Sequence, residues 1–400
     1  MYKFFLGNFV TNLVMLFALT AMLFAMDGVE FTVFRETIAG ILFGVAVCQI
    51  GFAQALTKCW NHISYQYSIG SIVAAIIFLV SVAFAELRPV KVFSDSPGPL
   101  LLNVCLCLMA WSAVRAGVLQ NTSKIDRMLI FQNAPKILLF AFSPLAIIHY
   151  NVWIATSSFF TMALLILEFS GKAPLPNRNT FWAHAYALNN LSSEVLKVLR
   201  ATGAPAIILM STVIGQHFEF LTSSLVDKQI GDFEIGFSRI SLIFSFLVSL
   251  MFFLQNKAIS NTIEHRLTTR TVLIFTCAAL SVVALLFGTL LGAALFFTGL
   301  SEALSIEAAP MAFILVFTKS VVWSTYFISG ALLYYLGFNW VSVTLSVLPL
   351  VYAALPFFGF INFPSMQDAC ITLICLMIIS SIVSNALITK ALKEKASGDA

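Results

Sequence analysis

The chain has 400 residues, of which 60% are hydrophobic and only 10% are charged, and its formal net charge is +4. Its mean hydropathy is +0.96. A soluble globular protein of this composition would lack the polar residues needed to cover its surface, so the composition excludes that class. The Lys and Arg residues are scattered through short segments, which argues against a nucleic-acid partner. The sequence therefore indicates a polytopic integral membrane protein.

Apolar stretches long enough to cross a bilayer recur along the chain. A transmembrane helix needs about 20 mostly apolar residues to cover about 30 Å of hydrocarbon. In the first half this length predicts membrane-spanning helices at residues 4–26, 37–57, 69–87, 99–120, 129–148 and 151–169. A polar stretch follows, in which charged residues such as Glu194 and Lys197 alternate with Leu and Val, and it predicts a linker with an amphipathic interfacial helix. The second half predicts further spans at residues 203–225, 234–257, 272–298, 310–335, 340–360 and 367–389.

This layout predicts an all-α fold of about twelve transmembrane helices arranged as two six-helix lobes. The expected domains are an N-terminal lobe, a cytoplasmic linker with the amphipathic helix, a C-terminal lobe and a cytoplasmic tail, at residues 1–170, 171–202, 203–390 and 391–400. Two bundles joined by an inner linker are typical of duplicated transporters, whose substrate site lies between the halves. Since no residue-level repeat is visible, twelve helices of unrelated origin are the alternative.

The basic residues outside the spans predict the orientation, because short cytoplasmic loops carry an excess of Lys and Arg. With both termini in the cytoplasm, fourteen of these residues lie inside, and only Arg35, Arg88, Lys91 and Lys228 lie outside. We therefore expect a multi-pass protein with both termini in the cytoplasm.

Four basic residues lie within the predicted spans: Arg115, Lys136, Arg239 and Lys319. Burying a charge in hydrocarbon costs about 2.5 to 3.5 kcal/mol, so such residues usually face the bundle interior or a watery cavity. A Lys or Arg near a helix end can instead reach the interface on its long stem, but Lys319 lies about 14 Å from the nearer surface. We predict that the four cations line a path for an anionic substrate, with buried ion pairs or snorkelling as the alternatives.

Glu219 is the one acid well inside a span, and His217 lies two residues before it. A membrane carboxylate or histidine can bind and release a proton, and a carboxylate can also ligate sodium. Glu219, His217 and the loop residue Asp227 are therefore the candidates for ion coupling, with H⁺ and Na⁺ both open. An ion pair between Glu219 and a base such as Arg239 is the alternative. Enzymatic motifs and metal-ligand spacings are missing from the sequence, so we expect no catalysis, no metal and no cofactor.

Two stretches resemble the polysaccharide flippases of the multidrug, oligosaccharidyl-lipid and polysaccharide exporter (MOP) superfamily. In residues 223–240, an acid and then Gly231 precede an Ile-Gly-Phe step and the pair Ser238-Arg239. The second stretch combines Gly28-Val-Glu-Phe with the glycine-containing residues 39–44 and 49–56. The resemblance implies two six-helix lobes around a V-shaped cavity. It also implies that a lipid-diphosphate-linked oligosaccharide crosses from the inner to the outer leaflet of a bacterial inner membrane, driven by an ion gradient.

The predicted function is therefore that of an O-antigen type flippase in lipopolysaccharide or related polysaccharide biosynthesis. A diphosphate would be held by charge-assisted contacts to Arg and Lys in a low-dielectric cavity. The expected partners are the lipid-linked oligosaccharide, membrane lipids and a polysaccharide polymerase of the same pathway, and we expect a monomer. A drug or cation antiporter of the same fold is one alternative, for which acids would be expected within the spans. A membrane polysaccharide polymerase or ligase is another, but it would usually have a large outer loop.

Overall fold

The structure is a computed structural model that describes residues 2–59, 66–87, 98–121, 125–170, 188–223, 233, 235–237, 240–241, 311–312, 314–319, 322–323, 326, 339–357 and 365–398. These residues form helices and turns, and none of them lies in a strand, which confirms the predicted all-α class. Within these ranges, six helices are long and apolar enough to cross a membrane. Two shorter apolar helical stretches occur at Leu13–Ala25 and Trp340–Tyr352.

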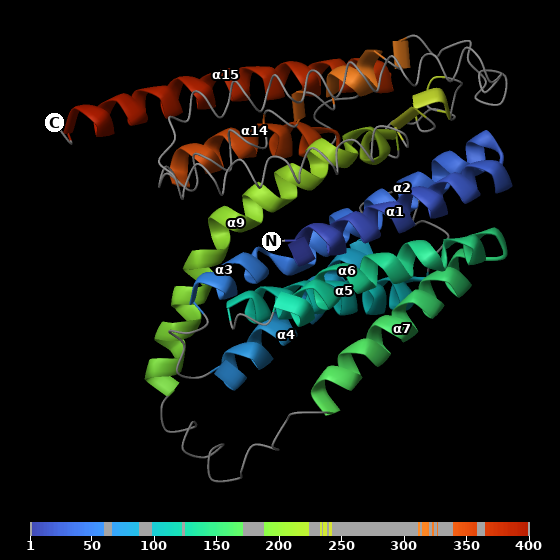
Figure 1. The fold of residues 1–400 in the computed structure, drawn as a ribbon, viewed down its shortest axis with the longest axis horizontal. Helices are drawn as coiled ribbons and strands as arrows, with labels where there is room; N and C mark the ends of the chain where they lie inside the picture. Colours follow the sequence, from blue (N-terminus) through green and yellow to red (C-terminus); the bar gives the residue numbers. More distant parts are fainter. Residues whose placement is uncertain are drawn as a thin grey trace. The chain divides into compact units, whose positions relative to one another are not determined.

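The chain divides into two compact units. Unit 1 consists of Met1–Ala25 and Thr37–Met210, and unit 2 of Met26–Glu36 and Ser211–Ala400. Two long helices labelled in Figure 1, α2 (Gly28–Gln49) and α9 (Leu188–Ser223), contribute residues to both units.

Helix α5 is the centre of unit 1, where it packs against α3, α4, α6 and α7, while α1 packs against α6 and the short helix η3 (Figure 1). The bounds of these elements are α1 (Tyr2–Ala25), α3 (Phe52–Cys59), α4 (Gln66–Leu87), α5 (Pro99–Asn121), α6 (Ile125–Ala141), η3 (Ser143–Ile147) and α7 (Tyr150–Ser170). Four predicted spans therefore correspond, within a few residues, to α1, α4, α5 and α7.

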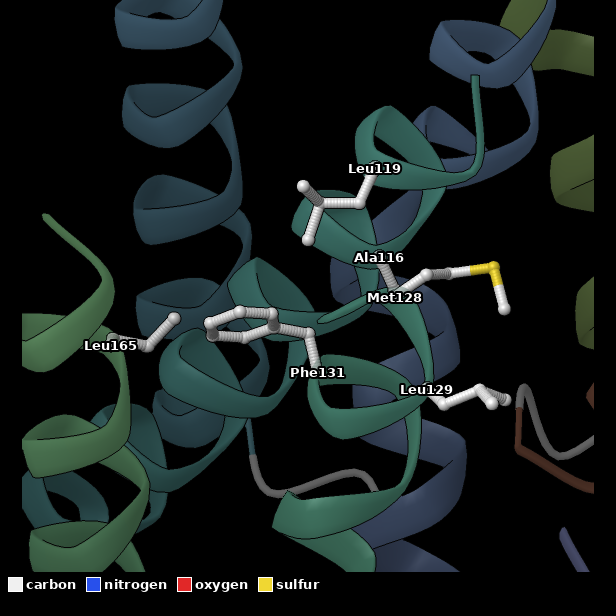
Figure 2. Packing of buried hydrophobic residues seen from close by; sticks show 6 residues of the cluster. All are labelled: Ala116, Leu119, Met128, Leu129, Phe131 and Leu165. Atoms are coloured by element: carbon white, nitrogen blue, oxygen red, sulfur yellow. The ribbon is translucent and has the colours of Figure 1, made fainter. Parts of the chain in front are cut away.

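An apolar cluster joins α5 and α6 and extends to α7. Figure 2 shows the ring of Phe131 on α6 pointing towards Leu165 of α7, and the other buried members of the cluster are Ala116, Leu119, Met128 and Leu129. The Ser112 hydroxyl of α5 adds a polar contact, since it donates to the carbonyl oxygen of Phe131 at 2.7 Å. Helices in a bilayer associate through close packing rather than through exclusion of water, so this cluster holds the centre of unit 1 together.

Helix α6 ends earlier than the predicted span 129–148. It stops at Ala141 and continues as the 3₁₀ helix η3, because Pro144 has no N–H to extend the α-helical hydrogen bonds. The carbonyl oxygen of Leu139 accepts a hydrogen bond from α7, donated by the indole N–H of Trp153 at 2.7 Å. The end of α6 and the start of α7 therefore form one hydrogen-bonded corner.

Helix α2 begins at Gly28, not at residue 37 as predicted. Asp27 and Glu30 form a reciprocal cap: the Glu30 N–H donates to Asp27 Oδ1 at 2.8 Å, and the Asp27 N–H donates to Glu30 Oε2 at 3.3 Å. This is the capping-box arrangement that satisfies two backbone donors at a helix start. Arg35, assigned above to an outer loop, therefore lies within a helix that is long enough to span the membrane.

A tight joint separates α2 from α3, so the predicted single span 37–57 is two helices. Ile50 and Gly51 have φ angles of 46° and 69°, in the left-handed region that favours glycine. A Cβ on Gly51 would lie 2.6 Å from the backbone nitrogen of Ala206 and 2.7 Å from the carbonyl oxygen of Thr202. Only glycine therefore allows this joint to approach the backbone of α9 so closely.

Helix α9 is continuous over 36 residues, so the predicted amphipathic helix and the predicted span 203–225 belong to one helix. Pro205 lies inside it, and Figure 1 shows that α9 changes direction along its length. A proline removes one backbone hydrogen bond and is a common cause of such bends.

In unit 2, α14 (Asn339–Phe357) packs against α15 (Met366–Gly398), close to the predicted spans 340–360 and 367–389. The Tyr352 hydroxyl links them by donating to the carbonyl oxygen of Ala369 at 3.2 Å. The predicted span 272–298 lies outside the described residues, and 234–257 and 310–335 are described only in part.

Candidate functional site

Within unit 2, aromatic residues anchor the helical segment that carries Lys319. The hydroxyl groups of Tyr326 and Ser211 of α9 are 2.8 Å apart, and the Tyr326 hydroxyl is 3.5 Å from the carbonyl oxygen of Leu345 in α14. Gly215 of α9 makes room for Trp323, because a Cβ there would lie 2.6 Å from the indole Cδ1. The residues around Lys319 are therefore held against both α9 and α14.

Lys319 is buried, with 7% of its surface exposed. It lies four residues before Trp323 and seven before Tyr326, a helical spacing that places all three on one face. Trp323 and Tyr326 are buried as well. Lys319 is thus on the packed side of its helix, as the sequence predicts from its depth in the span.

Arg35 and Glu36 of α2 are two further buried charged residues of unit 2, with 7% and 4% of their surfaces exposed. Arg35 Nη2 donates to the Oγ of Ser241 at 3.1 Å, and Ser241 is also only 7% exposed. Phe31 and Phe34, both fully buried, lie on the same turns of α2, with their ring centroids 6.4 Å apart. The first turns of α2 therefore carry buried charged residues next to buried aromatic residues in the sequence.

Sequence reasoning missed Arg35 and Glu36 because their charges placed them in a loop. The signal that identifies them is the capping pair Asp27 and Glu30, which marks a helix start upstream of both residues. Ser241 directly follows the first of the two stretches that resemble the polysaccharide flippases, and Arg35 lies between two parts of the second.

The other predicted site residues are distributed over both units. Arg115 on α5 is half-buried and Lys136 on α6 is exposed, and both belong to unit 1. Glu219 and His217 lie in α9, but their side chains are outside the described part of the structure, as are Arg239 and Asp227 altogether. In the described ranges, no group of three or more His, Cys, Asp or Glu side chains is arranged to hold a metal ion. The described part of unit 2 thus contains three buried charged residues, Arg35, Glu36 and Lys319.

No protein-family model and no curated protein matches the sequence. Solved structures match over almost the whole chain. An outward-facing multidrug resistance MATE family transporter of the MOP superfamily has a TM-score of 0.56 at 13% identity, covering 98% of this chain and 94% of its own. A MOP superfamily transporter from Pyrococcus furiosus has a TM-score of 0.55 at 11% identity, covering 98% and 93%. A mutant of the Vibrio cholerae MATE transporter VcmN has a TM-score of 0.54 at 15% identity, covering 98% and 99%.

These similarities concern the fold, because the identities are low. They agree with the apolar helices of unit 1 and unit 2, whose lengths suit a bilayer. The chain therefore has the fold of the MATE transporters of the MOP superfamily, a multi-pass membrane transporter fold.

Proposed function

We propose that this protein moves a polyprenyl-diphosphate-linked oligosaccharide from the inner to the outer leaflet of a bacterial inner membrane by ion-coupled alternating access. The observation that carries the proposal is the burial of Lys319, 7% exposed, on the packed face of a helix in a predicted span. Because burying a cation in a span costs about 2.5 to 3.5 kcal/mol, such residues usually face the bundle interior or a watery cavity, where an anionic substrate can contact them. A diphosphate supplies the negative charge, and charge-assisted hydrogen bonds are strong at low dielectric.

Arg35 is a second buried basic residue of unit 2. The described residues of this unit thus include two buried bases, Arg35 and Lys319, and one buried acid, Glu36. A guanidinium suits a phosphate group particularly well because its fork of N–H donors matches the phosphate oxygens. The Pyrococcus furiosus transporter is described as having a binding pocket of reverse polarity that suggests a different function. This description supports the view that transporters of this fold differ in the polarity of their binding pockets.

A drug or cation antiporter is the second candidate function. The similarity to a multidrug resistance transporter favours it, and so does the buried carboxylate of Glu36, which is 4% exposed within α2. A carboxylate in a membrane helix attracts cations and can also take up a coupling proton. The two candidates differ in the charge of the transported solute, which an experiment can separate.

The test uses the full chain in liposomes that contain either a fluorescent lipid-diphosphate-linked oligosaccharide or a fluorescent organic cation. We expect lipid movement between leaflets above the protein-free rate and no accumulation of the cation. Lys319→Ala should reduce the rate of lipid movement about tenfold or more, since a hydrogen bond to a charged group contributes about 1.5 to 3 kcal/mol. Lys197→Ala is the matched control, because Lys197 is exposed on α9 and its loss should leave the rate unchanged.

Two results would contradict the proposal. Accumulation of the organic cation without movement of the lipid would show that the protein is a cation antiporter and not a flippase. An unchanged rate of lipid movement in Lys319→Ala would remove Lys319 from substrate binding, and with it the observation on which the proposal depends.

The remaining predicted residues have roles within the same proposal. Arg239, Arg115 and Lys136 would add cationic contacts along the path of the diphosphate, and Glu219, His217 and Asp227 are the candidates for ion coupling. Imposing a proton gradient and a sodium gradient separately on the same liposomes identifies the coupling ion. Equal rates with and without either gradient would contradict ion coupling.

The proposed topology places both termini and the linker at residues 171–202 in the cytoplasm. A green fluorescent protein fused after Ala400 should be fluorescent, because this reporter folds on the cytoplasmic side, whereas an alkaline phosphatase fused at the same position should be inactive. An active phosphatase fusion would invert the proposed orientation.

A further inference from the structure

The helical segment that carries Lys319 runs antiparallel to the end of α9 within unit 2. Ser211 of α9 lies opposite Tyr326, with 2.8 Å between their hydroxyl groups. Gly215, four residues further along α9, lies against the indole of Trp323, which is three residues before Tyr326. The residue numbers therefore rise along α9 while they fall along its neighbour, and one turn of each helix faces one turn of the other.

One turn further in the same direction, this register reaches Glu219 and Lys319. Glu219 is four residues after Gly215 within the continuous helix α9, so the two positions share a face of that helix. Lys319 is four residues before Trp323 on the packed face of its own segment. Long side chains lean towards the start of their own helix, so Tyr326, Trp323 and Lys319 are displaced alike and the register carries over to Lys319. Glu219 thus occupies the position on α9 that is opposite Lys319.

The charges at these two positions are complementary. Lys319 is 7% exposed, and burying an ammonium group is costly unless a counter-charge lies close to it. Glu219 is the one acid well inside a predicted span, and Lys319 lies deeper within its span than the other three bases. Pairing them lets each charge reduce the burial cost of the other.

We propose that Glu219 and Lys319 form a buried ion pair between α9 and the segment that carries Lys319. The pair makes Lys319, rather than Arg239, the partner of Glu219, and it rests on the helix register alone. A consequence for transport rests in addition on the proposed function: the diphosphate of the substrate and the carboxylate of Glu219 would compete for one ammonium group. A carboxylate that loses this partner takes up a proton more readily, so substrate binding and ion coupling would share one site.

A double-variant cycle of thermal unfolding tests the pair in the full chain, in detergent and without substrate. Glu219→Ala and Lys319→Ala should each lower the melting temperature by about 5 °C or more, because each leaves the opposite charge buried without its partner. The double variant should lose less than the sum of the two, and the exchanged charges in Glu219→Lys/Lys319→Glu should melt above either single variant. Glu36→Ala with Lys319→Ala is the matched control, since Glu36 is also a buried acid of unit 2, and its losses should add. Additive losses for Glu219 and Lys319, or coupling of Glu219 to Arg239 instead, would overturn the pair.

Cross-linking tests the register directly, in a full-length background whose seven native cysteines are replaced by serine. A short thiol-reactive linker should join Glu219→Cys/Lys319→Cys and should not join Leu221→Cys/Lys319→Cys, because residues two apart do not share a face of a helix. If a charge variant does not fold, this measurement decides, and equal linking of both pairs or no linking of the first would overturn the proposal. A protein that shows the coupling and the cross-link but moves no lipid would refute the proposed substrate and leave the ion pair standing.

Discussion

The contact between α5 and α6 and the first turns of α2 are both buried, but they are built from different side chains. The first is apolar, and its polar tie is the Ser112 hydroxyl on the carbonyl oxygen of Phe131. The second contains Arg35 and Glu36, and the hydrogen bond from Arg35 to Ser241 is one of its polar contacts. Apolar packing stabilises a membrane protein without a desolvation cost, whereas buried charge has such a cost. Charged residues within spans are therefore usually functional. Under the proposed function, α5 and α6 form scaffold and the start of α2 takes part in transport.

Truncation of the scaffold should have the largest effect on stability. Phe131→Ala leaves a void of about 100 Å³, which at about 24 cal/mol per Å³ lowers the free energy of unfolding by about 2 kcal/mol. The transfer part of the usual cost is smaller here, because lipid chains are as apolar as the core. Ile130→Ala is the matched control, since Ile130 is the exposed neighbour of Phe131. Thermal unfolding in detergent measures both, and equal losses would contradict the assignment of this contact as scaffold.

Two serine variants compare the regions directly. Ser112→Ala and Ser241→Ala each remove one buried hydroxyl group, and each should lower stability by about 0.6 kcal/mol, the average for hydrogen bonds measured between membrane helices. Only Ser241→Ala should also change the rate of lipid movement, because only that hydroxyl contacts a charged residue of α2. Equal transport rates at equal stability would remove the functional distinction between the regions.

Removal of the cap on α2 should have the smallest effect. Asp27→Ala loses the acceptor for the Glu30 N–H, and because both residues are exposed, we expect a loss of about 0.5 kcal/mol, at the lower end for helix caps. Ser365→Ala removes a similar cap on α15, where the Asp368 N–H donates to the Ser365 hydroxyl at 3.1 Å, and it should cost about as much. A much larger loss for Asp27→Ala alone would mean that the cap also positions Arg35.

The sequence predicts the spans well where one physical signal dominates. Helices α4, α5 and α7 are largely apolar and are bounded by charge, proline or glycine, so hydropathy locates them. Hydropathy does not locate the helix ends where a cap or a left-handed backbone conformation sets them. The cap at Asp27 starts α2 early, and the positive φ angles at Ile50 and Gly51 end it early, in a joint that depends on the distant backbone of α9.

The candidate site is predictable only in part for a related reason. The depth of Lys319 within an apolar run indicates its burial, and the structure has it buried. Arg35 and Glu36 lie close to other charged residues, so the sequence analysis started the span after them, at residue 37. Arg35 donates to Ser241, a residue far along the chain, and no local pattern contains that contact.

The length of α9 has a consequence for the lipid environment. At 1.5 Å per residue, 36 residues extend over about 54 Å, which exceeds the hydrocarbon thickness by about 24 Å. The surplus belongs to the end that carries Glu194, Lys197 and Arg200, which are better solvated among headgroups than among acyl chains. Acyl chains of different lengths would therefore shift how many turns of α9 emerge at that end, and hydrophobic mismatch in the host membrane would affect this helix directly.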